Sequence, residues 1–241
     1  MEAQVERLSR DVLALIDAGG SGPRVIIGIS GVPGSGKTTL STAVSARINE
    51  LYRERSRSSQ SSNDAPPEPL AVSISMDGFH YSRAHLAAMP NAAEAIHRRG
   101  AAFTFDAEGS LALISRLADD TSARGVIYAP SFGHEIKDPV ADAVAIAPTS
   151  RVVLVEGNYC ALDREPWRRA AALMTRLWYV DAPPAVVHAR LAARHLASGI
   201  VADEREAWER ATGTDELNAQ DIRNNLLQVD EIISADQLTI N

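Results

Sequence analysis

The chain of 241 residues is long enough for one α/β domain with a sizeable core, or for such a domain with a small lid. Its formal net charge of −7 argues against a polynucleotide partner, which needs a basic face, but leaves a single nucleotide possible. Its one cysteine, Cys160, excludes an intrachain disulfide framework and a cysteine-rich metal site. We expect a buried thiol there, because Cys160 follows an apolar strand.

The first 18 residues are amphipathic and carry interspersed charges, without the apolar core of a signal peptide. The rest of the chain has no apolar run of membrane-spanning length. These features predict a cytoplasmic protein without a membrane partner.

The first predicted strand, residues 25–29, is short, β-branched and apolar, as a buried parallel strand requires. From Thr39 to Tyr52 apolar residues recur at helical spacing. Between these elements lies a loop of the pattern G-x-x-x-x-G-K-[ST], formed by Gly31, Val32, Pro33, Gly34, Ser35, Gly36, Lys37 and Thr38. A strand, a glycine loop and a helix in this order predict a nucleoside triphosphate site.

The residue types of this loop suit a polyphosphate. Its glycines let successive backbone N–H groups face phosphate oxygens, and the helix that follows adds the positive end of its dipole. Lys37 is expected to reach the β- and γ-phosphates, and Thr38 to offer its hydroxyl to Mg²⁺. The segment from Gly31 to Thr39 is therefore the predicted ATP site.

Residues 55–69 are rich in Ser, Asn and Pro and lack periodicity, so we expect a flexible loop. The second predicted strand, residues 70–75, leads into Asp77. Because the first and second strands commonly flank the phosphate loop, Asp77 is expected near the γ-phosphate, where it could accept a proton from an attacking hydroxyl. Alternatively, Asp77 caps the helix that begins near Ser82.

Strand and helix patterns alternate over the rest of the chain. Helical patterns cover residues 106–118, 165–174, 184–197 and 203–227, and apolar strands cover residues 151–155, 177–180 and 230–233. This alternation predicts a single α/β domain in which helices cover both faces of a parallel sheet. Ligands bind beyond the carboxyl ends of such strands. Glu156, directly after the third strand, is therefore the second predicted Mg²⁺ ligand, although Asp is more usual there.

Five ordered segments resemble one family of enzymes. They are residues 31–38, Met76-Asp77-Gly78-Phe79-His80, Arg99-Gly100-Ala101 with Thr104-Phe105-Asp106, Pro130-Ser131-Phe132-Gly133-His134, and Val155-Glu156-Gly157-Asn158-Tyr159. Together they resemble the uridine kinase, phosphoribulokinase and bacterial pantothenate kinase branch of the P-loop kinases. The resemblance spans residues 26–233 and implies a P-loop NTPase fold with a small helical lid, ATP and Mg²⁺ as cofactors, and a small-molecule hydroxyl as acceptor.

The resemblance also implies roles for single residues. The family uses the acid after the second strand to activate the acceptor hydroxyl, which favours catalysis over capping for Asp77. Acceptor contacts are implied for a set of aromatic, imidazole and guanidinium groups: Phe79, His80, Arg99, Phe105, Tyr128, Phe132 and His134. For two of these another role stays open, because Phe105 could belong to the core and His134 could be a surface residue.

A lid is implied over residues 190–212. Arg190 and Arg194 lie four residues apart, hence on one helix face, and could grip the triphosphate as an arginine finger does. A merely solvated helix face is the alternative. Ser198-Gly199 is the predicted hinge. The segment from Asp215 to Asn218 resembles a D-x-x-N motif of the family that lies near the adenine, which implies that Asn218 contacts the base.

The sequence thus predicts an ATP- and Mg²⁺-dependent kinase in which Lys37, Asp77, Arg190 and Arg194 are catalytic. Its predicted acceptor is a nucleoside such as adenosine. Two alternatives stay open: a sugar or pantothenate-like alcohol as acceptor, and a regulatory P-loop NTPase without a small-molecule acceptor. No polynucleotide partner is expected, and the oligomeric state is open.

Overall fold

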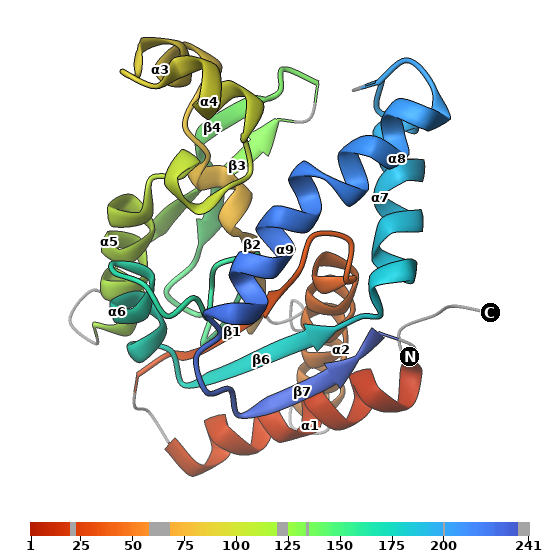
Figure 1. Ribbon diagram of the computed structural model, residues 1–241. Coiled ribbons are helices and arrows are strands. Elements are labelled where there is room, and N and C mark those ends of the chain that lie inside the picture. Colours follow the sequence, from red (N-terminus) through yellow and green to blue (C-terminus); the bar gives the residue numbers. More distant parts are fainter. Residues whose placement is uncertain (20–22, 58–67, 120–124, 134, 200, 236–241) are drawn as a thin grey trace.

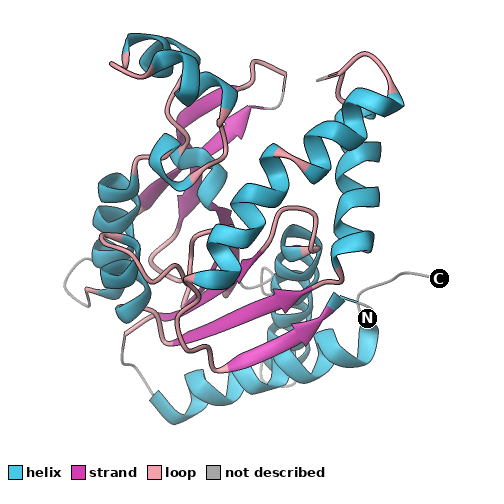
Figure 2. Cartoon of the chain, in the orientation of Figure 1, coloured by secondary structure: helices cyan, strands magenta, loops and turns pink. Residues whose placement is uncertain are grey.

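A five-stranded parallel sheet forms the centre of the protein (Figure 2). The structure is a computed structural model that describes residues 1–19, 23–57, 68–119, 125–133, 135–199 and 201–235. The strand order is β2-β5-β1-β6-β7. These strands are β1 (Val25–Gly31), β2 (Ala71–Ser75), β5 (Val152–Glu156), β6 (Arg176–Asp181) and β7 (Glu231–Ser234). All five predicted strands are confirmed, with small shifts at their ends.

Helices cover the sheet and extend beyond its carboxyl ends (Figure 1). Helices α1 and α2 contact each other, and α2 also contacts β1, β2 and β5. Helix α7 begins just after β6 and rises with α8 and α9 above the sheet (Figure 1). The helices are α1 (Glu2–Gly19), α2 (Lys37–Arg57), α3 (Arg83–Ala88), α4 (Ala92–His97), α5 (Ala107–Ala118), α6 (Trp167–Ala172), α7 (Pro184–Ala197), α8 (Glu204–Thr212) and α9 (Thr214–Asn224), with 3₁₀ turns η1 (Met76–Phe79) and η2 (Ala102–Thr104). Within the described residues, every helix falls short of the length or the apolar content that crossing a membrane requires.

The central strands are apolar on both faces, and this is why they lie inside. Every residue of β1 and β5 is buried, as expected for a parallel sheet with helices on both sides. Cys160 is buried as predicted, and burial raises the pKa of its thiol, so it is a poor nucleophile.

The strand order corrects one expectation. The first and second strands do not flank the phosphate loop together, because β5 lies between β1 and β2. Glu156 at the end of β5 is paired in register with Ile29 of β1 on one side and with Ser75 of β2 on the other. The acid after the third predicted strand therefore lies nearest the phosphate loop, and Asp77 lies one strand further away.

Two helix and loop boundaries also differ from the sequence prediction. The single helix expected over residues 203–227 is two helices, α8 and α9, which are divided at Gly213. Residues 55–57 of the predicted flexible loop belong to the last turn of α2, and residues 58–67 lie outside the described residues.

An antiparallel hairpin that the sequence did not predict lies beside the main sheet (Figure 2). Its strands are β3 (Ile127–Gly133) and β4 (Asp138–Ile146), and their register shifts between Ala129 and Ser131. The hairpin contacts η1 closely, because Gly78 has no side chain: a Cβ there would lie 2.4 Å from the Pro130 carbonyl oxygen. Through this contact β3 reaches the segment that carries Asp77.

Candidate active site

The phosphate loop links the buried strand β1 directly to helix α2. Gly34 and Gly36 have φ angles of 79° and 103°, which only glycine adopts without strain. The Ser35 hydroxyl is buried and has no hydrogen-bond partner within the described residues. Buried polar groups are nearly always paired, so this hydroxyl fits a loop whose missing partner is a ligand.

Lys37 begins α2, and its ammonium group is almost fully covered by protein. The side chain donates to the Val32 carbonyl oxygen and to Asn158 Oδ1, both at 2.9 Å. Burial lowers the pKa of Lys37, and the nearby carboxylates of Glu156 and Asp77 partly oppose that change. Both hydrogen-bond partners of this buried cation are neutral oxygens, so the ammonium group is suited to bind an anionic ligand.

Thr38 and Glu156 form the candidate metal site. The Thr38 hydroxyl donates to Glu156 Oε1 at 3.2 Å. Burial raises the pKa of Glu156, while Lys37 and a hydrogen bond from Ser75 lower it in part. A hydroxyl and a carboxylate are the hard oxygen donors that Mg²⁺ prefers, together with phosphate oxygens and water. The donor set therefore fits Mg²⁺, and a cation there would offset the cost of burying the carboxylate.

Asp77 lies in the first turn of η1, beyond the carboxyl end of β2. Its side chain is 47% exposed, and its backbone N–H donates to Ser75 Oγ at 3.2 Å. The helix that Asp77 was alternatively expected to cap is α3, but that cap is Ser82, whose Oγ accepts from the His85 N–H. Asp77 therefore has no capping role at α3, and about half of its side chain is exposed.

His80 follows on the same turn and is held by backbone and ring contacts. Its Nδ1 lies 2.9 Å from the Asp77 carbonyl oxygen and 3.8 Å from Asp77 Oδ1. Its ring lies 4.0 Å from the Phe105 ring and 5.0 Å from the Phe132 ring, between centroids. Burial lowers the pKa of His80, so the imidazole is neutral at pH 7.

The remaining predicted acceptor residues divide into those near His80 and those elsewhere. Arg99 stacks over the Phe132 ring at 5.5 Å and donates to Asp138 Oδ1 at 2.9 Å. Phe79 and Phe105 are both buried in the core, and the Phe105 ring packs against His80.

Tyr128 is 48% exposed and lies four residues before Phe132 on β3, about 13 Å along the strand. The structure therefore does not bring Tyr128 to the His80–Phe132 rings. His134 lies outside the described residues.

Helix α7 carries the two predicted lid arginines above the phosphate loop. Arg190 donates to the carbonyl oxygens of Gly34 and Ser35 at 3.3 and 3.4 Å. Arg194 is exposed, yet close enough for its charge to lower the pKa of Lys37. The helix ends at Ala197, and Gly199 follows with a φ of 62°, at the predicted hinge.

Two histidine–carboxylate pairs hold α7 against the start of α9. His188 Nε2 lies 2.9 Å from Glu216 Oε2, and His195 Nε2 lies 2.6 Å from Asp215 Oδ2. Asn218 of the same helix is buried, and its Oδ1 accepts from Arg98 at 3.1 Å. This predicted base contact thus connects α9 to the segment before Arg99.

Sequence reasoning missed three residues that shape the site. Asn158 binds Lys37, Asp138 binds Arg99, and the Tyr159 hydroxyl donates to the Gly100 carbonyl oxygen at 2.7 Å. Asn158 and Tyr159 lie in the segment Val155-Glu156-Gly157-Asn158-Tyr159, which resembles the kinase family, so the sequence did point to them. Asp138 lies in the hairpin that was not predicted, and no sequence pattern pointed to it.

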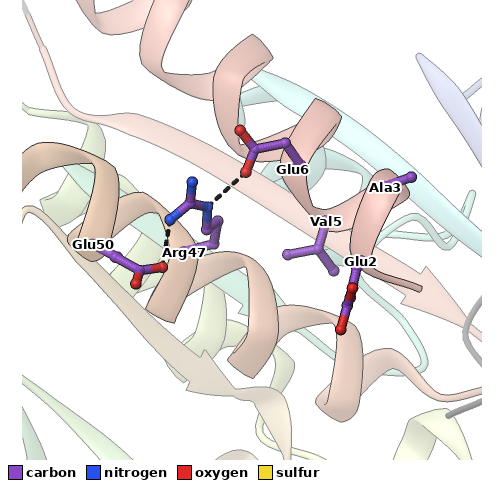
Figure 3. A pocket seen from close by; sticks show the side chains of 6 residues that line it. All are labelled: Glu2, Ala3, Val5, Glu6, Arg47 and Glu50. Atoms are coloured by element: carbon purple, nitrogen blue, oxygen red, sulfur yellow. Dashed lines mark hydrogen bonds and ion pairs between the residues drawn. The ribbon is translucent and has the colours of Figure 1, made fainter. Parts of the chain in front are cut away.

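A separate surface hollow lies between α1 and α2 (Figure 3). It has a volume of ≈ 390 Å³ and is lined by Glu2, Ala3, Val5, Glu6, Arg47 and Glu50. Arg47 binds Glu6 and Glu50 there, so its charge is already compensated. Arg47 also lies ten residues after Lys37, about 15 Å along the helix. This hollow is not part of the candidate active site.

Comparisons with known proteins relate the chain to kinases. No family model matches the chain. An ATP-dependent kinase-like protein of Aspergillus versicolor is 54% identical over 159 residues, which cover 66% of this chain and 92% of that relative. A Schizosaccharomyces pombe protein provisionally named a uridine kinase is 36% identical over 210 residues, 87% of this chain and 83% of that relative.

One solved structure is similar over nearly the whole chain. It is a protein of Silicibacter sp. TM1040, provisionally named a fructose transport system kinase, with 30% sequence identity and a TM-score of 0.78. The match covers 95% of this chain and 98% of that one.

Proposed function

Since the chain belongs to the uridine kinase, phosphoribulokinase and bacterial pantothenate kinase branch of the P-loop kinases, we propose that it transfers the γ-phosphoryl group of ATP to a hydroxyl of a nucleoside such as adenosine. The observation that carries the proposal is the exposed carboxylate of Asp77. It has no role as a cap of α3, it lies beside the imidazole of His80, and it is near enough to raise the pKa of Lys37.

The chemistry assigned to Asp77 is proton transfer. The acceptor oxygen forms a bond to the γ-phosphorus as the bond from that phosphorus to the β–γ bridging oxygen breaks, and ADP leaves with the electron pair. The hydroxyl proton passes to the Asp77 carboxylate. The half-exposed side chain has room to meet a hydroxyl, and the hydrogen bond from its backbone N–H to Ser75 fixes the turn that carries it.

The remaining assigned groups bind and neutralise phosphate. Lys37 presents its ammonium to the β- and γ-phosphates, and Arg190 and Arg194 approach from α7. Thr38 and Glu156 would hold Mg²⁺, which supplies charge neutralisation at the phosphates. In phosphoryl transfer, positioning and electrostatics account for almost all of the catalysis.

The choice of a nucleoside as acceptor is supported by ring faces near Asp77. Phe132 and His80 offer flat surfaces, and the His80 ring is neutral. Stacking of a base on protein aromatic groups contributes about 1–3 kcal/mol. The name of the Schizosaccharomyces pombe relative points to a nucleoside as well. A sugar is the second candidate, because the similar Silicibacter protein is provisionally named a fructose transport system kinase.

The experiment is a panel of acceptors with product analysis. Purified protein with ATP and Mg²⁺ is given adenosine, uridine, fructose, pantothenate or no acceptor, and ADP release is followed. We expect nucleosides, with adenosine first, to raise ADP release above the background without acceptor. Phosphorylation of fructose or pantothenate with every nucleoside inert would refute the nucleoside and keep the kinase, whereas equal ADP release with and without every acceptor would favour an NTPase.

A further inference from the structure

The ammonium group of Lys37 has more donors than partners. A lysine ammonium carries three N–H groups and no acceptor. Within the described residues, Nζ has two hydrogen-bond partners, the Val32 carbonyl oxygen and Asn158 Oδ1, both at 2.9 Å. The direction of the remaining N–H is set by these two contacts, because an sp³ nitrogen with two of its protons placed has no freedom for the last.

Asn158 is itself held in place from the neighbouring strand. Its backbone carbonyl oxygen accepts from the Ser30 hydroxyl at 3.0 Å, and Ser30 is fully buried in β1. The pairing of Ile29 with Glu156 brings the ends of β1 and β5 together at this point. Because the Ser30 contact uses the backbone of Asn158, a change of the Asn158 side chain leaves it intact.

The alternative partners of the ammonium are carboxylates. The charges of Glu156 and Asp77 raise the pKa of Lys37 more than the charge of any other acidic group does. Arg194 on α7 lowers this pKa, and the thiol of Cys160 also lies nearby. A free ammonium among these groups would be drawn towards a carboxylate. The amide of Asn158 is neutral, so it holds Lys37 without the strong attraction of a carboxylate that an arriving triphosphate would have to overcome.

From this geometry we propose that Asn158 is a positioning residue for Lys37. With Val32 it occupies two N–H groups of the ammonium, keeps it away from Glu156 and Asp77, and leaves the third N–H for the phosphates of ATP. The inference rests on the proposed role of Lys37 in binding ATP. Asn158 itself need not touch the nucleotide.

The test measures ATP affinity by calorimetry, in the absence of any acceptor, for Asn158→Ala and Asn158→Asp. We expect Asn158→Ala to weaken ATP binding about tenfold, at the lower end of the effect of losing a hydrogen bond to a charged group. Asn158→Asp, of the same size, should weaken binding more, because its carboxylate attracts the ammonium and repels phosphate. A purely structural asparagine would tolerate Asp at least as well as Ala.

A double-mutant cycle with Lys37→Ala separates positioning from a direct contact. If Asn158 acts through Lys37, Asn158→Ala should have no further effect on ATP affinity, measured at millimolar ATP, in the Lys37→Ala protein. Additive losses would overturn the proposal, as would unchanged affinity of the single variant Asn158→Ala. If Lys37→Ala alone left ATP affinity unchanged, the proposed function of the phosphate loop would fail instead.

Asn49 provides a matched control for the fold. It is also half-buried, and its side chain makes two hydrogen bonds of 2.8 Å, both with the backbone of Ala71. Asn49→Ala should lower the melting temperature while the ATP affinity of the folded protein stays the same. A loss of ATP affinity in Asn49→Ala equal to that in Asn158→Ala would refute a specific role for Asn158.

Discussion

Replacing Asp77 by asparagine removes the proposed base and changes almost nothing else. The side chain is 47% exposed, and among the residues that the structure describes its carboxylate has one close ionic partner, His80 Nδ1 at 3.8 Å. Its backbone N–H bond to Ser75 Oγ is retained in the variant, and the cap of α3 belongs to Ser82. Substitutions at such exposed positions change the free energy of unfolding by about 0.5 kcal/mol or less, so Asp77→Asn should fold normally.

The expected loss of activity is far larger than this change in stability. A positioned general base contributes about 10²–10⁴-fold to the rate, which is about 3–5 kcal/mol at 1.36 kcal/mol for each factor of ten. The kcat for acceptor-dependent ADP release should fall by that factor. ATP affinity, measured separately by calorimetry, should stay within about twofold, because Asp77 is not among the groups assigned to phosphate binding.

The matched control is Asp142→Asn, which makes the same chemical change at an exposed position of β4 with a φ of 51° that asparagine tolerates. This variant should keep normal kcat and a normal melting temperature. If Asp77→Asn also kept normal kcat while folded, the reasoning that assigns proton transfer to Asp77 would be refuted.

Three further predictions concern the phosphate loop, the lid and pH. Lys37→Ala should lower phosphoryl transfer about a hundredfold or more, as loss of one preorganised donor does; a folded variant with normal turnover contradicts this. Arg194→Ala should weaken ATP binding and lower kcat, whereas Arg53→Ala on the exposed face of α2 should do neither. Equal kinetics of the two variants would favour the alternative that Arg194 belongs to a solvated helix face without a role in catalysis. Burial lowers the pKa of His80 in the folded protein. As pH falls through 6.5, His80 is therefore protonated in the unfolded chain before it is protonated in the folded one, and the free energy of unfolding decreases. Urea unfolding at pH 7.5 and 5.5 should show a smaller decline for His80→Gln than for the native protein, and an equal decline would show that His80 is not the cause.

Sequence reasoning succeeded where the signal is local. The strand, loop and helix around Lys37 follow from apolar runs and glycine spacing within about 30 residues, and Val and Ile in β1 and β5 predict burial on both faces. The breaks at Ser198-Gly199 and the position of Glu156 after β5 are equally local signals.

The misses are long-range. The strand order that puts β5 between β1 and β2 depends on how crossovers pack, which no short pattern records. The contact from Lys37 to Asn158 joins residues 121 positions apart, and that from Arg98 to Asn218 joins residues 120 apart. Polar pairs of this kind depend on the register of strands and helices that are distant in sequence, so the partners of Asn158 and Asp138 emerge only from the folded chain.

The hairpin β3–β4 is a different kind of miss. Eight of the nine residues of β4 are half-buried or exposed, and β3 contains Pro130 at a shift of register. A half-exposed hairpin with a bulge carries a weak period-2 pattern, because one face is solvated and the shift interrupts the alternation.

The most direct test of the account is the fate of the γ-phosphate with adenosine as acceptor. Protein, ATP, Mg²⁺ and adenosine are incubated, and ADP, inorganic phosphate and phosphorylated adenosine are quantified together by chromatography and mass spectrometry. The account predicts one phosphomonoester of adenosine for each ADP, with little free phosphate, and loss of that product in Asp77→Asn. ADP formed with an equal amount of inorganic phosphate, and no phosphorylated adenosine, would contradict it.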